Sequence, residues 1–142
     1  MNRLAFITVI IFSTLTSCVN YGQLKIITDL PGSLKENSGF VTYGDSTVWA
    51  IEDSGNKNDI YQVNFKGDII KTLKVKNDQN DDWEDLTKDT TGNLYVANIG
   101  NNHNSRKNLV IYKLTNPNAE PGNNIDAEQI EFKLLLYMFL RV

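Results

Sequence analysis

Residues 38–50, SGFVTYGDSTVWA, are followed 46 positions later by a similar stretch, residues 84–96, EDLTKDTTGNLYV. Each stretch contains two short runs of β-branched, aliphatic or aromatic residues on either side of a turn cluster. The cluster holds Gly44 in the first stretch and Gly92 in the second. Runs of this kind, bounded by Gly, Asn, Asp and Ser, are typical of β-strands joined by tight turns. The two stretches therefore predict a repeated pair of strands.

The repeat continues beyond this pair. Residues 60–63, IYQV, are matched by residues 111–114, IYKL, at a spacing of 51, so the second unit has a longer loop before its third strand. Each unit holds four strand candidates, and the second unit ends with residues 129–132. Outside the N-terminal segment, no stretch of useful length keeps apolar residues at helical spacing. We therefore predict an all-β fold of two antiparallel four-stranded meanders, covering about residues 34–78 and 79–132.

A four-stranded unit that repeats at roughly 40 to 50 residues has the period of a β-propeller blade. From residue 30 to about residue 132 the chain resembles bacterial propellers of the TolB-like and SdiA-regulated kind. The residues that carry the resemblance precede the first strand or end the second strand of a unit: Ser38-Gly39-Phe40, residues 82–86 (DWEDL), residues 49–55 (WAIEDSG) and residues 95–100 (YVANIG). The resemblance implies blades arranged around an axis, and it implies a fold rather than an activity because propellers host unrelated functions.

Two blades are about a third of such a propeller, and repeat units generally need neighbours to be stable. We therefore expect an incomplete propeller. It is either a fragment of a longer protein or a module that completes itself by assembling with copies.

The N-terminus has the composition of a secretion signal. Residues 1–3, MNR, are a short charged segment, and residues 4–12, LAFITVIIF, form an apolar segment too short to span a bilayer. We predict a cleaved signal-peptide helix in residues 1–17, followed by a tether and a first strand in residues 18–29.

Residues 15–18, LTSC, resemble the lipobox of bacterial lipoproteins, in which a small residue precedes a Cys that is acylated before cleavage. Cys18 is the only cysteine of the chain, so no intrachain disulfide can form. We predict lipidation of Cys18, which would make the membrane a partner through a lipid anchor. The alternative is an incidental cysteine at the edge of an ordinary signal peptide.

These features predict an outer-membrane lipoprotein of the bacterial cell envelope. No acidic run follows Cys18, which favours a domain that faces the periplasm.

The formal charge of the whole chain is −3. A mildly acidic domain without a basic cluster argues against nucleic-acid binding, which depends on Lys and Arg to neutralise phosphates.

The C-terminus is unlike the rest of the chain. Residues 134–140, LLLYMFL, are apolar without alternation, and they are too few to cross a membrane. Two interpretations of the tail, residues 133–142, stay open: an out-of-frame or truncated end of a longer protein, and a buried terminal strand.

Acidic and Asn-rich loops are predicted to meet at one end of the fold. In a meander the loop before the first strand and the loop between the second and third strands share one end of the sheet. That end collects Asp82 and Glu84 before the second unit, the loop after Asn98 within it, and the loop after Asp53 in the first unit. We call this end the rim.

Carboxylates and amide carbonyls are the oxygen ligands that Ca²⁺ and Mg²⁺ prefer. Resemblance to gluconolactonase-like propellers implies that Glu84 and Asn98 hold such an ion, with Asp53 as a third ligand. Further residues of the predicted ligand-binding rim are Asp82, Trp83, Asp85, Asn101, Asn102 and His103. The alternatives are turn chemistry alone for the Asp and Asn residues and core packing for Trp83.

Catalytic residues are not predicted. His103 is the only histidine, and no Ser-His-Asp spacing or nucleophile elbow accompanies it. The favoured interpretation is a non-catalytic, membrane-anchored propeller domain that binds a ligand or partner at its rim. The alternatives are a metal-dependent hydrolase of lactones or phosphoesters, which the resemblance implies, and a truncated product without independent function.

Overall fold

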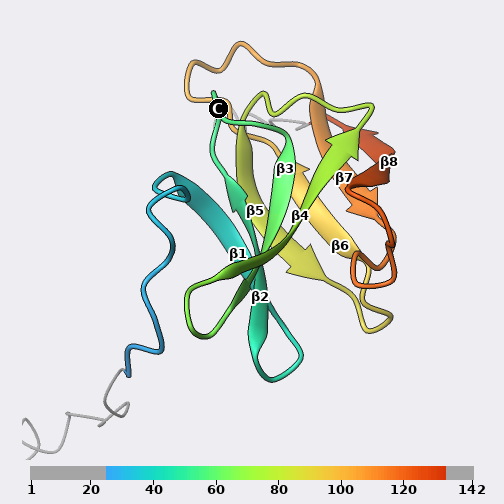
Figure 1. Cartoon of the computed structure of the whole chain (residues 1–142). Coiled ribbons are helices and arrows are strands. Elements are labelled where there is room, and N and C mark those ends of the chain that lie inside the picture. Colours follow the sequence, from blue (N-terminus) through green and yellow to red (C-terminus); the bar gives the residue numbers. More distant parts are fainter. Residues whose placement is uncertain (1–24, 134–142) are drawn as a thin grey trace, which may run out of the picture.

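The computed structural model describes residues 25–133. The predicted signal peptide, Cys18 and residues 134–142 of the tail lie outside this range. Within it the chain forms strands and no helix (Figure 1), so the described part contains no helix able to cross a bilayer. The strands are β1 (Asn37–Tyr43), β2 (Thr47–Glu52), β3 (Asp59–Asn64), β4 (Ile69–Lys76), β5 (Trp83–Lys88), β6 (Leu94–Asn98), β7 (Leu109–Leu114) and β8 (Asn124–Phe132).

Consecutive strands pair antiparallel within two groups of four, the first meander (β1–β4) and the second meander (β5–β8). The prediction of two four-stranded antiparallel meanders is confirmed. The last strand is longer than expected, because β8 begins at Asn124 rather than near Gln129.

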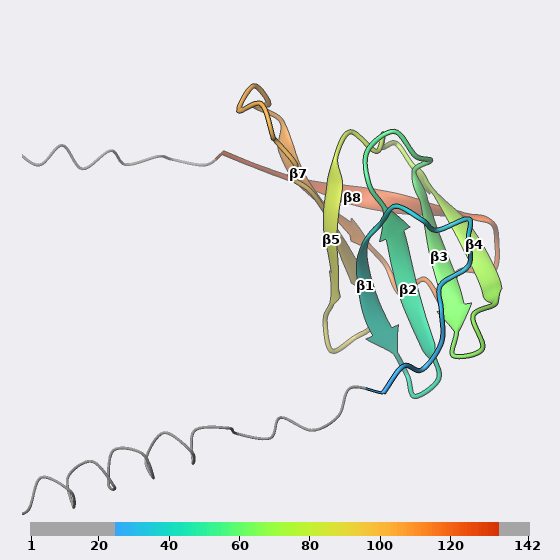
Figure 2. The same ribbon diagram turned by 90° about the vertical axis from the view of Figure 1, so that its left-hand side faces the viewer.

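The two meanders form one nearly closed, barrel-like sheet. Residues Lys74–Lys76 of β4 pair in parallel with Asn124–Asp126 of β8, which gives the strand order β1-β2-β3-β4-β8-β7-β6-β5. The two end strands, β1 and β5, lie next to each other without a hydrogen-bonded ladder (Figure 2). One side of the molecule is therefore closed by backbone pairing and the other by packing.

A single apolar core fills the space between the meanders. Trp49 of the first meander and Trp83 of the second are both fully buried in it. The core residues are Trp49, Ile51, Ile60, Leu73, Val75, Trp83, Leu86, Leu94, Val96, Val110, Tyr112, Leu114 and Ile125. Burial of this many large side chains, at about 1.5–3 kcal/mol each, is the main attraction between the two sheets.

The two meanders do not use the same face to make this core. Trp49 packs in it, whereas Tyr95, which occupies the same position 46 residues later, lies on the outer face of the second meander. Conversely, core residues Leu94 and Val96 correspond to Val48 and Ala50, which lie on the outer face of the first meander. The two meanders therefore stack front to back, which means that the inner face of the second corresponds in sequence to the outer face of the first.

The N-terminal segment covers the outer face of the first meander (Figure 2). Leu34 is 3% exposed and packs on Ala50 and Val63, and a turn closed by the Leu34 amide and the Pro31 carbonyl precedes β1. Residues 25–29, the described part of the predicted first strand, have no regular secondary structure. The strand prediction is wrong for these residues, because they have no neighbouring strand with which to pair.

Gly39 marks the closest approach of β1 to β5. A Cβ atom added there would lie 2.9 Å from the Leu86 nitrogen and 3.0 Å from the Asp85 Cα, which are both backbone atoms. Asp85 is the residue 46 positions after Gly39, so equivalent positions of the two repeats touch. Only glycine allows this contact without displacing β5.

We expect Gly39→Ala to destabilise the fold by about 1–3 kcal/mol, because the added methyl group must push β1 and β5 apart. Urea-induced unfolding of the two proteins measures the difference. Gly32→Ala is the matched control, since nothing lies within 4 Å of a Cβ at Gly32. Equal unfolding midpoints for both variants would contradict the close packing of β1 on β5.

Candidate functional site

Three loops meet at one end of the molecule, as the alternation of loops in a meander predicts. They join β2 to β3, β4 to β5, and β6 to β7, and Figure 2 shows them together at the end opposite the β1–β2 and β3–β4 turns. The rim therefore combines residues from both meanders.

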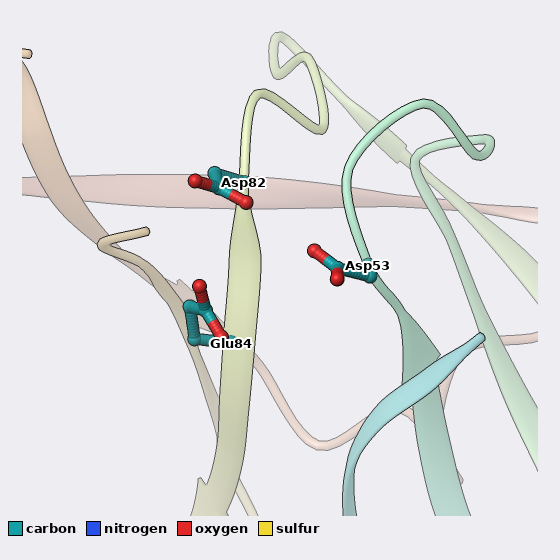
Figure 3. A group of neighbouring side chains, drawn as sticks. All are labelled: Asp53, Asp82 and Glu84. Carbon is teal, nitrogen blue, oxygen red and sulfur yellow. The ribbon is translucent and has the colours of Figure 1, made fainter. Parts of the chain in front are cut away.

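Three carboxylates of the rim converge on one point. Asp53 follows the end of β2, Asp82 immediately precedes β5, and Glu84 lies on β5 (Figure 3). One oxygen from each of the three lies within 4.8 Å of the others, which is a spacing that could hold a metal ion. Asp53 and Glu84 were predicted as ligands, and Asp82 was predicted as a rim residue. We call these three residues the acidic triad.

The acidic triad concentrates negative charge. The pKa of the Glu84 carboxyl is raised by partial burial and by the nearby charges of Asp82 and Asp53. Like charges at 4–5 Å repel by about 1–4 kcal/mol for effective dielectric constants between those of water and a protein surface. A divalent cation would relieve this repulsion, and carboxylate oxygens are ligands of the kind that Ca²⁺ and Mg²⁺ prefer.

Asn98 does not belong to the triad. It continues the inward row of β6 after Leu94 and Val96, and its side chain is fully buried. Its Oδ1 accepts hydrogen bonds from the Asp82 amide, at 3.0 Å, and from Arg106 Nη2, at 3.0 Å. Asn98 therefore fixes the backbone that carries Asp82, and the prediction that it lines a cation site is not supported by its position.

Asn80 connects the two meanders at the rim. Its Nδ2 donates to the carbonyls of Glu52 and Asp53, both at 2.9 Å, and its Oδ1 accepts from the Trp83 amide at 3.1 Å. The side chain thus holds the end of β2, which carries Asp53, against the start of β5, which carries Asp82 and Glu84. Asn80 could not be singled out from the sequence, since it is one of several polar residues in the connector between β4 and β5.

The loop between β6 and β7 packs closely behind the triad. Gly100 is buried, its amide donates to the Asp82 carbonyl at 3.1 Å, and a Cβ there would fall on the Asp82 and Glu84 carboxylates. Arg106 Nη1 donates to the Gly100 carbonyl at 2.8 Å. The Arg106 guanidinium also lies 3.6 Å from Asp81 of the connector between β4 and β5, so Arg106 links the two loops.

A pocket of about 210 Å³ lies beside the triad. Asp82 lines it and is shared with the triad, and the loop between β6 and β7 provides most of the remaining wall. The lining residues are Ser54, Asp82, Asn101, Asn102, His103, Ser105 and Arg106. The predicted rim residues Asn101, Asn102 and His103 are thus brought together. All the lining residues carry polar groups, and carbon atoms of the same side chains form about half of the wall.

Two predicted rim residues lie elsewhere. Trp83 is fully buried in the core between the sheets, because it starts β5 on the inward face, and it is not accessible to a ligand at the rim. Asp85 is exposed on β5, where its carboxylate accepts a hydrogen bond from the Leu86 amide at 2.8 Å, and it does not line the pocket. The alternative of core packing is correct for Trp83.

Asp78, which was not singled out from the sequence, is the most unusual carboxyl of the rim. It lies in the connector that carries Asp82, and both of its oxygens are buried without a hydrogen-bond partner of good geometry. Burial raises the pKa of Asp78 to about 6, an effect that the nearby Tyr112 hydroxyl, Gln79 amide and Trp83 indole only partly offset. The negative charge of Asp81 adds to the increase in pKa.

Comparisons with protein-family models, with curated proteins and with solved structures found no match for this chain. The functional interpretation therefore depends on the geometry of the rim and on the sequence.

We expect Asp78→Asn to stabilise the protein at pH 7 by about 1–2 kcal/mol. The rise in the pKa of Asp78 corresponds to a somewhat larger free energy, which is reduced here because the side chain is partly exposed to solvent. Folding favours the protonated carboxyl, because the pKa in the folded protein, about 6, lies above the usual 3.8. The stability gained from protonation is complete below about pH 4 and is lost as the pH rises through 6.

Urea unfolding of wild type and Asp78→Asn between pH 4 and pH 7 tests this expectation. The difference in unfolding free energy should be small at pH 4 and should grow as the pH rises. Asp45→Asn, in the exposed β1–β2 turn, is the control. A constant difference across this range would show that Asp78 is not a strained buried carboxyl.

Proposed function

We propose that this chain is a membrane-anchored, propeller-type binding domain whose rim holds a divalent cation and a small hydrophilic ligand. The observation that carries the proposal is the convergence of Asp53, Asp82 and Glu84, from two separate meanders, beside a pocket that shares Asp82. In this proposal the triad supplies the protein ligands of the cation. The side chains of Asn101, Asn102 and His103 provide hydrogen bonds to the small molecule.

The front-to-back stacking of the two meanders supports a propeller-type repeat. In a propeller each blade buries one face on the preceding blade and the other on the following blade, so equivalent residues face opposite neighbours. Trp49 is buried between the meanders, whereas its equivalent Tyr95 lies on the outer face. In the same way Phe40 is 61% exposed, whereas its equivalent Leu86 is buried. The membrane anchor is supported by residues 15–18, LTSC, after a short apolar segment, and the periplasmic location by Val19-Asn20, which follow Cys18 without an acidic run.

Calcium should raise the melting temperature of the wild-type protein, because an ion that binds only the folded state stabilises it by mass action. Glu84→Gln should remove most of this increase. In the absence of metal the same variant should melt at a higher temperature than wild type, because one of three mutually repelling charges is gone. Thermal unfolding with and without CaCl₂ measures both effects.

Asp85→Asn is the matched control for Glu84→Gln. Asp85 is the next residue on β5 and is exposed, and an Asn there can still accept the hydrogen bond from the Leu86 amide. This variant should respond to calcium as the wild type does. If calcium leaves the melting temperature of the wild type unchanged, and magnesium does so as well, the triad is not a cation site.

A metal-dependent hydrolase is the second candidate. The convergence of three carboxylates beside a pocket with His103 on its wall is the specific observation in its favour, since catalytic metal sites need such a set of groups near a substrate. We rank binding first because about 210 Å³ admits a small ligand but is below the roughly 300–1,000 Å³ of pockets that take larger molecules. The pocket has little room for a substrate together with attacking water.

We expect the calcium-loaded protein not to hydrolyse aryl lactones or p-nitrophenyl phosphoesters, although it binds the metal. A chromogenic assay with CaCl₂ measures the rate of hydrolysis. Turnover that disappears in Glu84→Gln and persists in Asp85→Asn would instead favour the hydrolase.

A further inference from the structure

The described chain begins with a cluster of exposed aliphatic side chains. Ile26 is 82% exposed, Ile27 is 62% exposed and Leu30 is 39% exposed, all within one stretch of five residues. Single exposed aliphatic residues are common on protein surfaces, but several in one short segment indicate a surface that contacts something apolar.

This segment is attached to the domain. The β3–β4 turn packs on it closely enough that a Cβ at Gly67 would lie 2.9 Å from the Asp29 carbonyl and 3.0 Å from Thr28 Oγ1. Leu34, a few residues further on, is anchored in the outer face of the first meander. The exposed Ile26 and Ile27 are thus presented at the end of the fold that contains the β3–β4 turn. Ile70, which is 53% exposed, follows this turn on β4.

The chain outside the structure limits how far this end can lie from a lipid anchor. Ile26 is eight positions after Cys18. A fully extended chain advances at most 3.3–3.6 Å per residue, so an acyl group on Cys18 lies within about 28 Å of Ile26. A domain on so short a tether stays at the membrane surface.

We infer that residues 25–30, together with the neighbouring β3–β4 turn, form a membrane-facing surface in which Ile26 and Ile27 enter the lipid headgroup region. This inference rests on the lipid anchor of the proposed function. It goes further, because it assigns a second contact with the bilayer and an orientation to the domain. The partner is the lipid surface itself.

The distribution of charge agrees with this orientation. The rim concentrates carboxylates, among them Asp53, Asp81, Asp82 and Glu84, and an anionic bilayer repels such a surface. Within residues 25–30 and the β3–β4 turn, Lys25 and Lys66 offset Asp29 and Asp68, while Asp45 and Asp89 lie in the other turns at this end. With residues 25–30 on the membrane, the acidic triad and its pocket face the aqueous compartment. A soluble ligand then reaches the rim without crossing the bilayer surface.

A fluorescent probe on the anchored full-length chain tests the inference. The protein is purified from a bacterial membrane fraction and reconstituted in vesicles of phosphatidylethanolamine and phosphatidylglycerol. Ile27→Cys and, as the matched rim control, Asn102→Cys are labelled with the environment-sensitive dye NBD. Acylated Cys18 does not react with the dye, so each protein carries one label.

We expect the emission of the label at position 27 to shift to the blue and to be quenched several-fold more by a lipid-attached quencher than the label at position 102. Adding Ile26→Asp should reduce the quenching at position 27, because a charge at this site disfavours insertion. Ile99→Asp, an exposed isoleucine near the rim, should leave it unchanged. Equal, water-like emission at positions 27 and 102 would overturn the inference.

Mass spectrometry of the same preparation separates the two ways of failing. If Cys18 carries acyl chains and position 27 remains in water, the lipid anchor stands and the membrane-facing surface is wrong. If Cys18 carries no acyl chain, the anchor of the proposed function is wrong, and the inference that rests on it fails as well.

Discussion

The apolar contact between the two meanders is the constraint on which the other features depend. Trp49 and Trp83 are buried between the sheets, and the close approach at Gly39 holds β1 beside β5. Because the sheets are held in this relation, the loops after β2, before β5 and after β6 open at the same end. The polar rim follows from the packing of the core.

The rim itself is organised by amides rather than by charges. Asn80 connects Asp53 to the start of β5, and Asn98 fixes the amide of Asp82 from inside the core. These neutral groups hold the acidic residues close together despite their mutual repulsion. A buried and unpaired Asp78 in the same connector adds a further cost at neutral pH. Active and binding sites often store strain of this kind, which the rest of the fold compensates.

Much of the fold could be predicted from the sequence. Turn residues such as Gly44 and Gly92, between runs of β-branched and aromatic residues, defined the hairpins, and the spacing of 46 positions defined the two meanders. The parallel pairing of β4 with β8 could not be predicted, because Lys74–Lys76 and Asn124–Asp126 are far apart in the chain and carry no pairing signal. Residues 18–29 were expected to be a tether and a first strand, and the described part, residues 25–29, forms no strand, because a strand needs a partner that local sequence does not supply.

The candidate site was predicted in part. The alternation of loops in a meander placed Asp53, Asp82 and Glu84 at one end, and the structure brings them within reach of one ion. Trp83, expected at the rim, lies in the core, and the buried side chain of Asn98 accepts hydrogen bonds from Asp82 and Arg106. Both lie at strand ends, where a shift of one residue in the strand register moves a side chain between the core and the rim. Asn80, Gly100 and Arg106 were not predicted, because their roles arise from contacts between loops.

The inequivalence of the two faces of each meander has a consequence for how such a protein can change in length. The N-terminal segment covers the outer face of the first meander, whereas the outer face of the second meander, which holds Tyr95 where the first meander holds Trp49, is not covered by any described segment. A further unit added by duplication of the encoding segment would therefore pack next to the second meander, on the face that holds Tyr95. An arrangement of this kind extends in one direction only, because each new unit packs its inner face on the outer face of the unit before it.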